Sequence, residues 1–208
     1  NEIRMLVDIE NGQKTGYFLD QRENRAALKP FVKDARVLDT FSHTGGFALH
    51  AAYYGAREVT AVDISEHAIE YLKRNADING LQKKINGVTG NVFDVLKEYQ
   101  TLNEKFDVVI LDPPAFCKTK SALSGAYRGY KDINLRGMKI LNPGGFLVTC
   151  SCSHYMYPGL FMEMIQDAAM DAGKIVRQVE FRTQAKDHPV LYGFNESMYL
   201  KCIILQVI

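Results

Sequence analysis

Two short segments of this sequence carry side chains that could do chemistry: Asp112-Pro113-Pro114 and the cysteine at position 152. The acidic segment follows an apolar run, Phe106–Leu111, of the kind that forms a buried parallel strand. Proline cannot donate to a strand ladder, so the strand must end there and leave a carboxylate and backbone carbonyls free. Such acceptors beside Phe116 suit a planar group with N–H donors, such as a nucleobase. The alternative is a plain strand-ending turn in which Asp112 caps a helix.

Cys152 follows the next expected strand, Gly145–Thr149, in the polar setting Ser151-Cys152-Ser153-His154. A thiolate that adds to C6 of cytosine makes C5 nucleophilic enough to attack a sulfonium methyl group, and loss of the C5 proton then expels the thiol. A cysteine near a strand is more often a small buried hydrophobic residue. Because Cys152 lies past the strand end rather than within it, we interpret it as the nucleophile.

The other sulfur and imidazole groups near this segment receive different interpretations. Cys150 shares the face of Cys152 but lies one pleat deeper, so we assign it to the core. Cys117 follows Phe116, and the chain direction carries it away from the base, while Cys202 lies in an apolar strand. His154 is close enough in sequence to help remove a proton, but polar loop histidines are commonly spectators. The cysteines lack paired metal-ligand spacing, so we expect free thiols and no metal site.

A glycine-containing loop follows the expected strand Arg36–Thr40. Its end, Gly45-Gly46-Phe47, would allow close backbone approach to a ligand at the start of a helix. A dinucleotide site would need Gly-x-Gly-x-x-Gly, whereas this loop carries the bulky Phe41 and His43. The loop therefore favours a smaller, uncharged or zwitterionic ligand.

One polar residue also follows each of the next two expected strands. Asp63 ends the strand that begins at Glu58, where a carboxylate can accept two hydrogen bonds from a ribose diol. Asn91 follows Ile85–Thr89 and could accept a hydrogen bond from an adenine amino group. Asp63 could instead cap the helix that begins at Glu66. The order of these residues, one per strand end, favours S-adenosylmethionine over NAD.

These residues need a sheet to bring them together, and strands alternate with helices from Arg36 onward. Such βα units predict a Rossmann-like α/β fold with a mostly parallel seven-stranded sheet and helices on both faces. Two final strands without a helix between them predict an antiparallel pair at one edge. The expected strands are Arg36–Thr40, Glu58–Val62, Ile85–Thr89, Phe106–Leu111, Gly145–Thr149, Lys174–Phe181 and Met198–Ile208. The expected helices are Gly46–Tyr54, Glu66–Asn79, Val92–Tyr99, Asp132–Leu141 and Leu160–Ala172.

The segment before the sheet is expected to form a small appendage. Alternation in Arg4–Ile9 and Thr15–Leu19 around Asn11-Gly12 predicts a β-hairpin, and a helix should follow over Gln21–Val32. We therefore divide the chain into an N-terminal hairpin and helix, residues 1–34, and the α/β domain that follows, residues 35–208. The chain begins with Asn1 rather than methionine, so we expect it to be part of a longer protein.

The bulk composition is that of a soluble globular protein, with 208 residues, 47% hydrophobic and 24% charged. No apolar stretch approaches the ~20 residues of a membrane span, and no signal peptide opens the chain, so we expect a cytoplasmic protein. The net charge of +1 hides a basic segment between Ala115 and Ile140, interleaved with Tyr127 and Tyr130. This basic segment consists of Lys118, Lys120, Arg128, Lys131, Arg136 and Lys139 against one acid, Asp132. It could follow an RNA backbone or form a solvated helix face.

Taken together, these segments resemble a known family. They are GQKTGYFLDQRENR, VLDTFSHTGGF, AVDIS, DPPAF, PGGFLVTCSCSH and HPV…GFNESMYLK. They are similar to the catalytic domain of the bacterial and archaeal large-subunit rRNA cytosine-5 methyltransferases with an N-terminal PUA domain. The match runs from about Gly12 to Gln206. It implies a class I methyltransferase fold, S-adenosylmethionine as donor, and 5-methylcytosine in 23S rRNA as product. It also implies that residues 1–34 line the cofactor site and that residues 35–208 are a methyltransferase domain.

The resemblance also assigns roles to residues, with Cys152 as nucleophile and Asp112 positioning the base. We expect cofactor contacts from Lys14, Thr15, Phe18, Arg22, Asp39, Phe41, Ser42, Thr44, Gly45, Gly46, Phe47, Asp63, Ile64, Asn91, Val92 and Asp112. We expect substrate contacts from Pro113, Pro114, Phe116, Lys118, Lys120 and Arg128. The chain departs from the family pattern in two ways. Asn91 stands where the family commonly has Asp, which concerns that one assignment, and the PUA domain is absent from this chain, so we expect most of the RNA affinity to be missing too.

Two other functions remain open at this point. One is an RNA guanine or amino-group methyltransferase that uses Asp112 and Phe116 without a covalent step, since some relatives with a similar Asp-Pro-Pro loop modify guanine and lack the cysteine. The other is a non-catalytic module that binds S-adenosylmethionine or RNA on the same scaffold. Cys152 discriminates, because neither alternative needs a thiolate there. The residues leave open whether the protein forms a homodimer.

Overall fold

The computed structural model describes residues 3–10 and 16–208, and its centre is a seven-stranded sheet in the order β3-β2-β1-β4-β5-β7-β6. The strands are β1 (Arg36–Thr40), β2 (Glu58–Asp63), β3 (Ile85–Thr89), β4 (Phe106–Leu111), β5 (Leu141–Ser151), β6 (Val176–Arg182) and β7 (Lys201–Val207). Strands β1 to β5 are parallel, whereas β7 runs antiparallel to both β5 and β6. The Rossmann-like α/β fold and the antiparallel pair at one edge are therefore confirmed.

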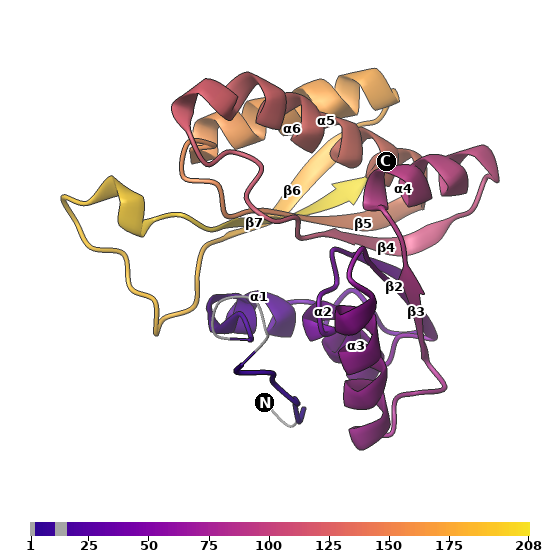
Figure 1. Cartoon of the computed structure of the whole chain (residues 1–208). Helices are drawn as coiled ribbons and strands as arrows, with labels where there is room; N and C mark the ends of the chain where they lie inside the picture. The colour runs from indigo at the N-terminus through magenta and orange to yellow at the C-terminus, as the bar shows by residue number, and fades with distance from the viewer. Residues whose placement is uncertain (1–2, 11–15) are drawn as a thin grey trace.

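Helices cover both faces of this sheet (Figure 1). One layer contains α1 (Arg22–Ala26), α2 (Gly46–Tyr53) and α3 (Glu66–Ile78), and the other contains α4 (Val92–Thr101), α5 (Leu123–Lys139) and α6 (Pro158–Ala172). Short 3₁₀ turns occur at η1 (Leu19–Gln21), η2 (Lys120–Ala122) and η3 (Asn195–Ser197). Among the described residues, no helix is both long and apolar enough to cross a membrane.

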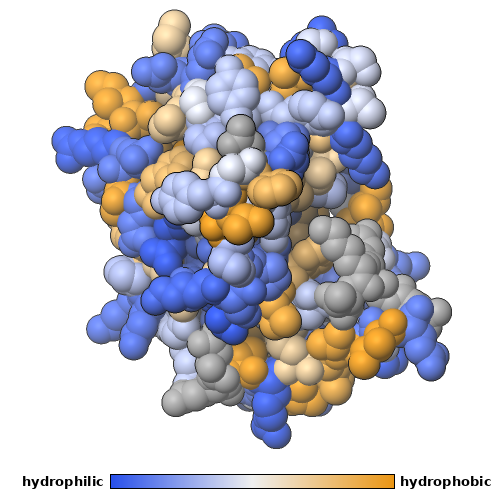
Figure 2. Space-filling model, turned by 90° about the vertical axis from the view of Figure 1, so that its left-hand side faces the viewer, coloured by the Kyte–Doolittle hydropathy of each residue, from blue (hydrophilic) through white to orange (hydrophobic). Residues whose placement is uncertain are grey.

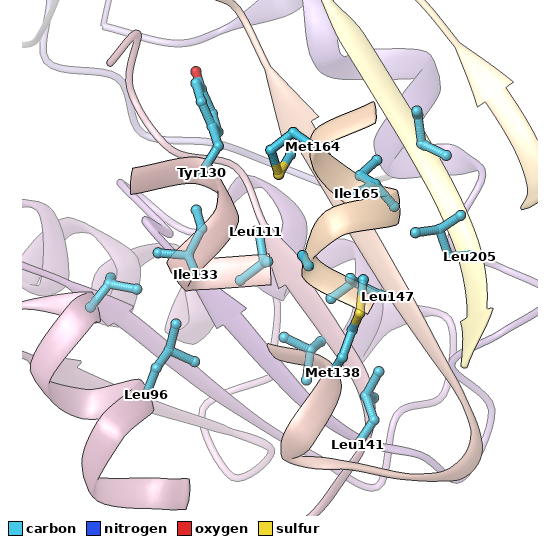
Figure 3. Close-up of a cluster of buried hydrophobic side chains, with 14 of the residues drawn as sticks. Leu96, Leu111, Tyr130, Ile133, Met138, Leu141, Leu147, Met164, Ile165 and Leu205 are labelled. Atoms are coloured by element: carbon cyan, nitrogen blue, oxygen red, sulfur yellow. The ribbon is translucent and has the colours of Figure 1, made fainter. Parts of the chain in front are cut away.

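The central strands are buried on both faces, which explains why their sequences read as continuous apolar runs rather than alternating ones. Successive residues of β4 point to opposite sides: Val109 and Leu111 join the core under α4, α5 and α6, while Val108 and Ile110 join the core under α2 and α3. Figure 3 shows the first of these cores, where Leu111 lies among side chains from α5 and α6.

The N-terminal prediction is partly wrong. The expected turn at Asn11-Gly12 lies outside the described residues, but residues 3–8 form no strand, and residues 16–18 lead into η1. This segment instead runs along α3, where Asn75 accepts a hydrogen bond from the Leu6 amide at 2.7 Å. The predicted helix over Gln21–Val32 ends at Ala26, ahead of Pro30.

The helix after the Asp-Pro-Pro segment is longer than predicted, beginning at Leu123 rather than Asp132. Its first half contains Gly125 and Gly129, which have low helix propensity. The reason for Gly129 is tertiary: a Cβ at this position would lie 3.3 Å from the Phe116 ring. Packing of Phe116 against the helix therefore overrides local propensity.

Candidate active site

A cavity of about 390 Å³ opens at the carboxyl ends of the parallel strands. Its walls come from the loops after β1 to β5, from the segment between Gly16 and Arg25, and from Leu200 ahead of β7. The long loop between β6 and β7 extends from this side of the molecule in Figure 1. Figure 2 looks onto the same side and shows hydrophobic residues among hydrophilic ones. The size suits a small organic cofactor.

The loop after β1 has an unusual backbone. Phe41 and His43 have φ values of 57° and 49°, and Gly45 has a φ of 93°. Left-handed conformations are uncommon for residues other than glycine and often mark functional sites. The His43 amide of this loop donates to Asp63, and the Ala48 amide of the helix that follows donates to Asp39; both bonds help to hold the loop in place.

Asp63 and Asp39 both support the loop, but only Asp63 lines the cavity. Asp63 accepts from the His43 amide at 2.8 Å and from the Ser65 amide at 2.9 Å. Asp39 is 1% exposed and accepts from the Ala48 amide at 2.8 Å, beneath the loop. Burial raises the pKa of Asp39 well above its ordinary value. The cap of α3 is Ser65, so Asp63 does not serve as that cap.

The structure brings most of the expected cofactor residues to the cavity wall. These are Phe18, Phe41, Ser42, Thr44, Gly46, Phe47, Asp63, Ile64, Asn91, Val92 and Asp112. Gly45 does not line the cavity, and Arg22 pairs instead with Asp187 at 3.1 Å. Lys14 and Thr15 lie outside the described residues. Asn91 is exposed and caps α4 through a 2.9 Å hydrogen bond from the Phe93 amide.

Arg25 is a cavity residue that the sequence analysis missed. It is only 3% exposed, donates to the Tyr17 hydroxyl and to the Phe18 carbonyl, and lies 4.2 Å from the centre of the Tyr17 ring. Its Nε has no hydrogen-bond partner among the described residues. Gly46 leaves room for it, since a Cβ there would approach Nε to 2.9 Å.

Asp112 lies at the end of β4, where its Oδ1 accepts from Gln21 Nε2 at 2.8 Å. Burial raises the pKa of Asp112 to about 6, and the positive charge of Arg25 opposes that rise. The Gln21 amide is oriented by Asn24, which donates to Gln21 Oε1 at 2.7 Å. Gln21 and Arg25 are four residues apart, a spacing that places two side chains on the same face of a helix. This spacing could have indicated from the sequence that both residues face the same site.

Cys152 is the one cysteine of the four that lines the cavity, and all four lie in the described residues. Cys150 is fully buried opposite Cys202, and burial raises the pKa of its thiol. Cys117 is also buried, and its Sγ donates to the Thr119 carbonyl at 3.1 Å. Pro113 and Pro114 line the cavity near Asp112. Nucleophilic and acceptor groups therefore converge from β4 and β5.

A buried polar network connects the two chain segments that carry Asp112 and Cys152. Tyr130 of α5 is fully buried, and its hydroxyl lies 2.9 Å from Ser153 Oγ and 3.1 Å from Ser151 Oγ. Ser153 Oγ also accepts from the Cys117 amide at 3.1 Å. The network thus ties the loop after β4 to the residues on either side of Cys152.

The other expected substrate residues do not line the cavity. Phe116 packs against Tyr130, with the centres of the two rings 4.7 Å apart. Lys118, Lys120 and Arg128 are exposed, with no ion pair within the described ranges. Elsewhere in the basic segment, Lys131 pairs with Asp171 at 2.9 Å and Arg136 with Asp132 at 3.0 Å.

Several cavity residues were not assigned to the site in the sequence analysis. They are Asp8, Gly16, Tyr17, Asp20, Gln21, Arg25, His43, Ser65, His67, Ala68, Tyr71, Phe93 and Leu200. Within residues 3–10 and 16–208, no group of three or more His, Cys, Asp or Glu side chains could hold a metal ion.

Comparison with known proteins decides the family. Residues 1–195 match the model of the S-adenosylmethionine-dependent methyltransferases. The chain belongs to this family. Its cofactor is therefore S-adenosylmethionine, as the loops after β1 and β2 predicted. The cavity fits that group: Asp63 lies in its wall at a strand end, and Arg25 keeps a buried Nε donor that has no hydrogen-bond partner among the described residues.

The methyltransferase domain has similar relatives over nearly its whole length. It is 50% identical over 200 residues to the ribosomal RNA large subunit methyltransferase I of Klebsiella pneumoniae, covering 96% of this chain. It is 45% identical over 207 residues to the protein of that name from Aeromonas salmonicida, covering 99% of this chain. The chain spans about half of these relatives, 50% and 52%.

A solved structure agrees with this assignment. The domain is similar to a crystal structure described as a methyltransferase complexed with SAH, with a TM-score of 0.88 and 26% identity. The match covers 98% of this chain and 53% of the other. A SAM-dependent methyltransferase structure from Streptococcus mutans gives a TM-score of 0.87 at 25% identity, covering 98% and 53% of the two chains.

Proposed function

We propose that this methyltransferase domain methylates C5 of a cytosine in large-subunit (23S) ribosomal RNA through a covalent bond between Cys152 and C6. The observation that carries the proposal is the convergence of Cys152 and Asp112 on one cavity from the adjacent strands β5 and β4. The names of the relatives supply the ribosomal RNA substrate. That substrate, in turn, supports a cytoplasmic location.

The cysteine supplies the step that activates the base. The Cys152 thiolate forms a bond to C6, and the ring electrons that this displaces make C5 nucleophilic. S-adenosylmethionine, when bound, supplies the methyl group. Loss of the C5 proton then restores the double bond, breaks the bond between sulfur and C6, and returns the thiolate.

Asp112 holds the base while this happens. Gln21 donates to Oδ1 of Asp112, and Asp112 lies in the cavity wall, where its carboxylate can accept from the cytosine amino group. Since burial raises its pKa to about 6, Asp112 is close enough to neutrality to share a proton with N3 as charge develops on the ring. Pro113 and Pro114 shape the wall beside it.

The test is methylation of unmodified 23S rRNA by the full-length protein with labelled S-adenosylmethionine, followed by digestion to nucleosides. We expect 5-methylcytosine as product. Cys152→Ser should abolish methylation and preserve cofactor binding, whereas Cys117→Ser and Cys150→Ser serve as matched controls and should stay active. RNA that contains 5-fluorocytosine should form a covalent adduct, because fluorine cannot leave as a proton.

Three outcomes would contradict the proposal. A methylated guanine, or a methylated amino group, would assign the domain to the non-covalent alternative. Turnover by Cys152→Ala, or an adduct on Cys117 or Cys150, would exclude Cys152 as the nucleophile.

A further inference from the structure

Lys201 is a buried lysine at the start of β7, opposite Ser151 of β5 in the strand register. It is 1% exposed, although lysine is almost never fully buried without compensation of its charge. Its Nζ donates to the carbonyl of Ser153 at 2.7 Å and to that of Tyr199 at 2.9 Å. An ammonium group carries three N–H donors. In the described part of the chain, no carboxylate pairs with Lys201.

The position of Lys201 relates it directly to Cys152. Ser153, whose carbonyl accepts from Nζ, is the next residue after Cys152 in the chain. Burial lowers the pKa of Lys201 to about 8, and the charge of Cys152 acts in the opposite direction. The hydrogen bond to Ser153 therefore places the lysine ammonium group beside the residue that follows Cys152.

Two other groups whose pKa values respond to the charge of Cys152 are neutral near pH 7. They are the hydroxyls of Tyr130, from α5, and Tyr199, which precedes β7. Burial is the main cause that raises the pKa of both, to about 12 for Tyr130. Tyr199 donates to Asp20 of η1 at 2.8 Å.

Three carboxylates near the cavity are arranged around another cation, Arg25. Arg25 interacts with Asp20, Asp39 and Asp112, which surround it from η1, β1 and the end of β4. His154, which follows Ser153, is exposed. Lys201 is thus a buried cation beside the turn that carries Cys152.

We infer that Lys201 is a positioning residue for the proposed nucleophile: its ammonium group holds the turn at Cys152 and Ser153 and stabilises the Cys152 thiolate. The inference rests on the function proposed above. A nearby ammonium favours a thiolate over a thiol, and this effect is strong where water is excluded. The same lysine therefore fixes the direction of the turn and raises the fraction of reactive sulfur.

The experiment measures the rate of Cys152 alkylation by iodoacetamide against pH, in the full chain without cofactor, by mass spectrometry of the Cys152 peptide. Lys201→Met removes the charge and keeps the length of the side chain. We expect the pH midpoint of alkylation to rise by about one unit and the rate at pH 7 to fall about tenfold. Lys201→Arg keeps the charge and should stay within about twofold of the wild type.

Lys105→Met is the matched control. Lys105 precedes β4 at the opposite end of the sheet, is partly buried, and donates from Nζ to the Lys139 carbonyl at 2.7 Å. Its replacement should leave Cys152 alkylation unchanged. Far-UV circular dichroism checks folding, and Lys201→Gln, which keeps an N–H donor without the charge, replaces Lys201→Met if that variant does not fold.

An unchanged alkylation midpoint in a folded, uncharged Lys201 variant overturns the inference, even if Cys152→Ala proves inactive in methylation. Conversely, an upward shift supports the electrostatic role of Lys201 even if Cys152→Ala keeps methylating RNA. The failure of the proposed function and the failure of this inference are therefore distinguishable.

Discussion

Gln21 and Asp112 are joined by a 2.8 Å hydrogen bond, although 91 residues separate them in the sequence. This contact ties the segment before the sheet to the end of β4, so the N-terminal residues form one wall of the cavity rather than an independent appendage. Leu28 and Val32 likewise belong to the core under α2 and α3. The site therefore depends on both parts of the chain.

Replacing Asp112 by Asn should change how stability depends on pH. The folded protein binds the Asp112 proton more tightly than the unfolded chain does, because burial raises its pKa from 3.8 to about 6. Wild-type stability should therefore fall as the pH rises through this interval and stay lower above it. At pH 7 we expect Asp112→Asn to be more stable by about 3 kcal/mol, with no difference below pH ~4. Urea unfolding across pH 4–7 measures this, and parallel curves would contradict it.

Replacing Arg25 by Met should destabilise the protein. The change leaves Asp20, Asp39 and Asp112 without the buried cation that offsets their charges. Breaking such an arrangement by removing one partner costs about 3 kcal/mol or more. Arg22→Met is the control, because its ion pair with Asp187 is exposed and should contribute about 1 kcal/mol or less. Equal losses in urea unfolding for the two variants would refute the central role of Arg25.

Replacing Asp63 by Ala should weaken binding of S-adenosylmethionine about tenfold or more, because hydrogen bonds to a carboxylate contribute about 1.5–3 kcal/mol each. The variant also removes acceptors for the His43 and Ser65 amides, which hold the loop. Asp94→Ala, at an exposed position in the first turn of α4, is the control. Isothermal titration calorimetry measures the affinity of each variant for S-adenosylmethionine. If Asp63→Ala binds the cofactor as tightly as the wild type, Asp63 is not a cofactor-binding residue.

Alanine substitutions at two glycines of α5, Gly125 and Gly129, distinguish the effect of helix propensity from the effect of packing. At Gly125 a Cβ would meet nothing within 4 Å, so Gly125→Ala should stabilise the protein by about 0.5–1 kcal/mol. At Gly129 the added atom would press on the Phe116 ring at 3.3 Å, so Gly129→Ala should gain less or lose stability. Thermal unfolding distinguishes them, and equal gains would show that Phe116 moves without cost.

The unpaired cations of the basic segment should contribute to RNA binding. RNA affinity falls as salt concentration rises, and the steepness of this fall on a log–log plot reflects the number of phosphates contacted. If Lys118, Lys120 and Arg128 each contact one phosphate, replacing all three by Ala should reduce the magnitude of that slope by about two. Affinity for S-adenosylmethionine should not change. The double variant Lys131→Ala and Arg136→Ala, whose side chains already pair with acids, should alter the slope less. A slope that is the same in the triple variant and the wild type would mean a solvated surface.

From Arg36 onward, the sequence alone determined the order of strands and helices, and it singled out the two segments that carry Asp112 and Cys152. Apolar runs such as Phe106–Leu111 end at prolines or polar residues, and these local signals need no knowledge of distant contacts. The strand over Ile85–Thr89 and the strand Phe106–Leu111 were predicted with the observed bounds. Because parallel strands present their carboxyl ends at one edge of a sheet, the convergence of Asp63, Asp112 and Cys152 followed from their positions after those ends.

Only the tertiary structure decided which other residues complete the site. Gln21 and Arg25 reach the cavity because the N-terminal segment packs across the carboxyl ends of the strands, and Lys201 reaches Ser153 because β7 inserts beside β5. Such contacts between residues far apart in the chain cannot be predicted from local sequence patterns. The early start of α5 has the same origin, since Phe116 packs against Gly129 and compensates for a poor helix former. Burial and charge at these contacts, rather than residue type, give Asp112 and Lys201 their shifted pKa values.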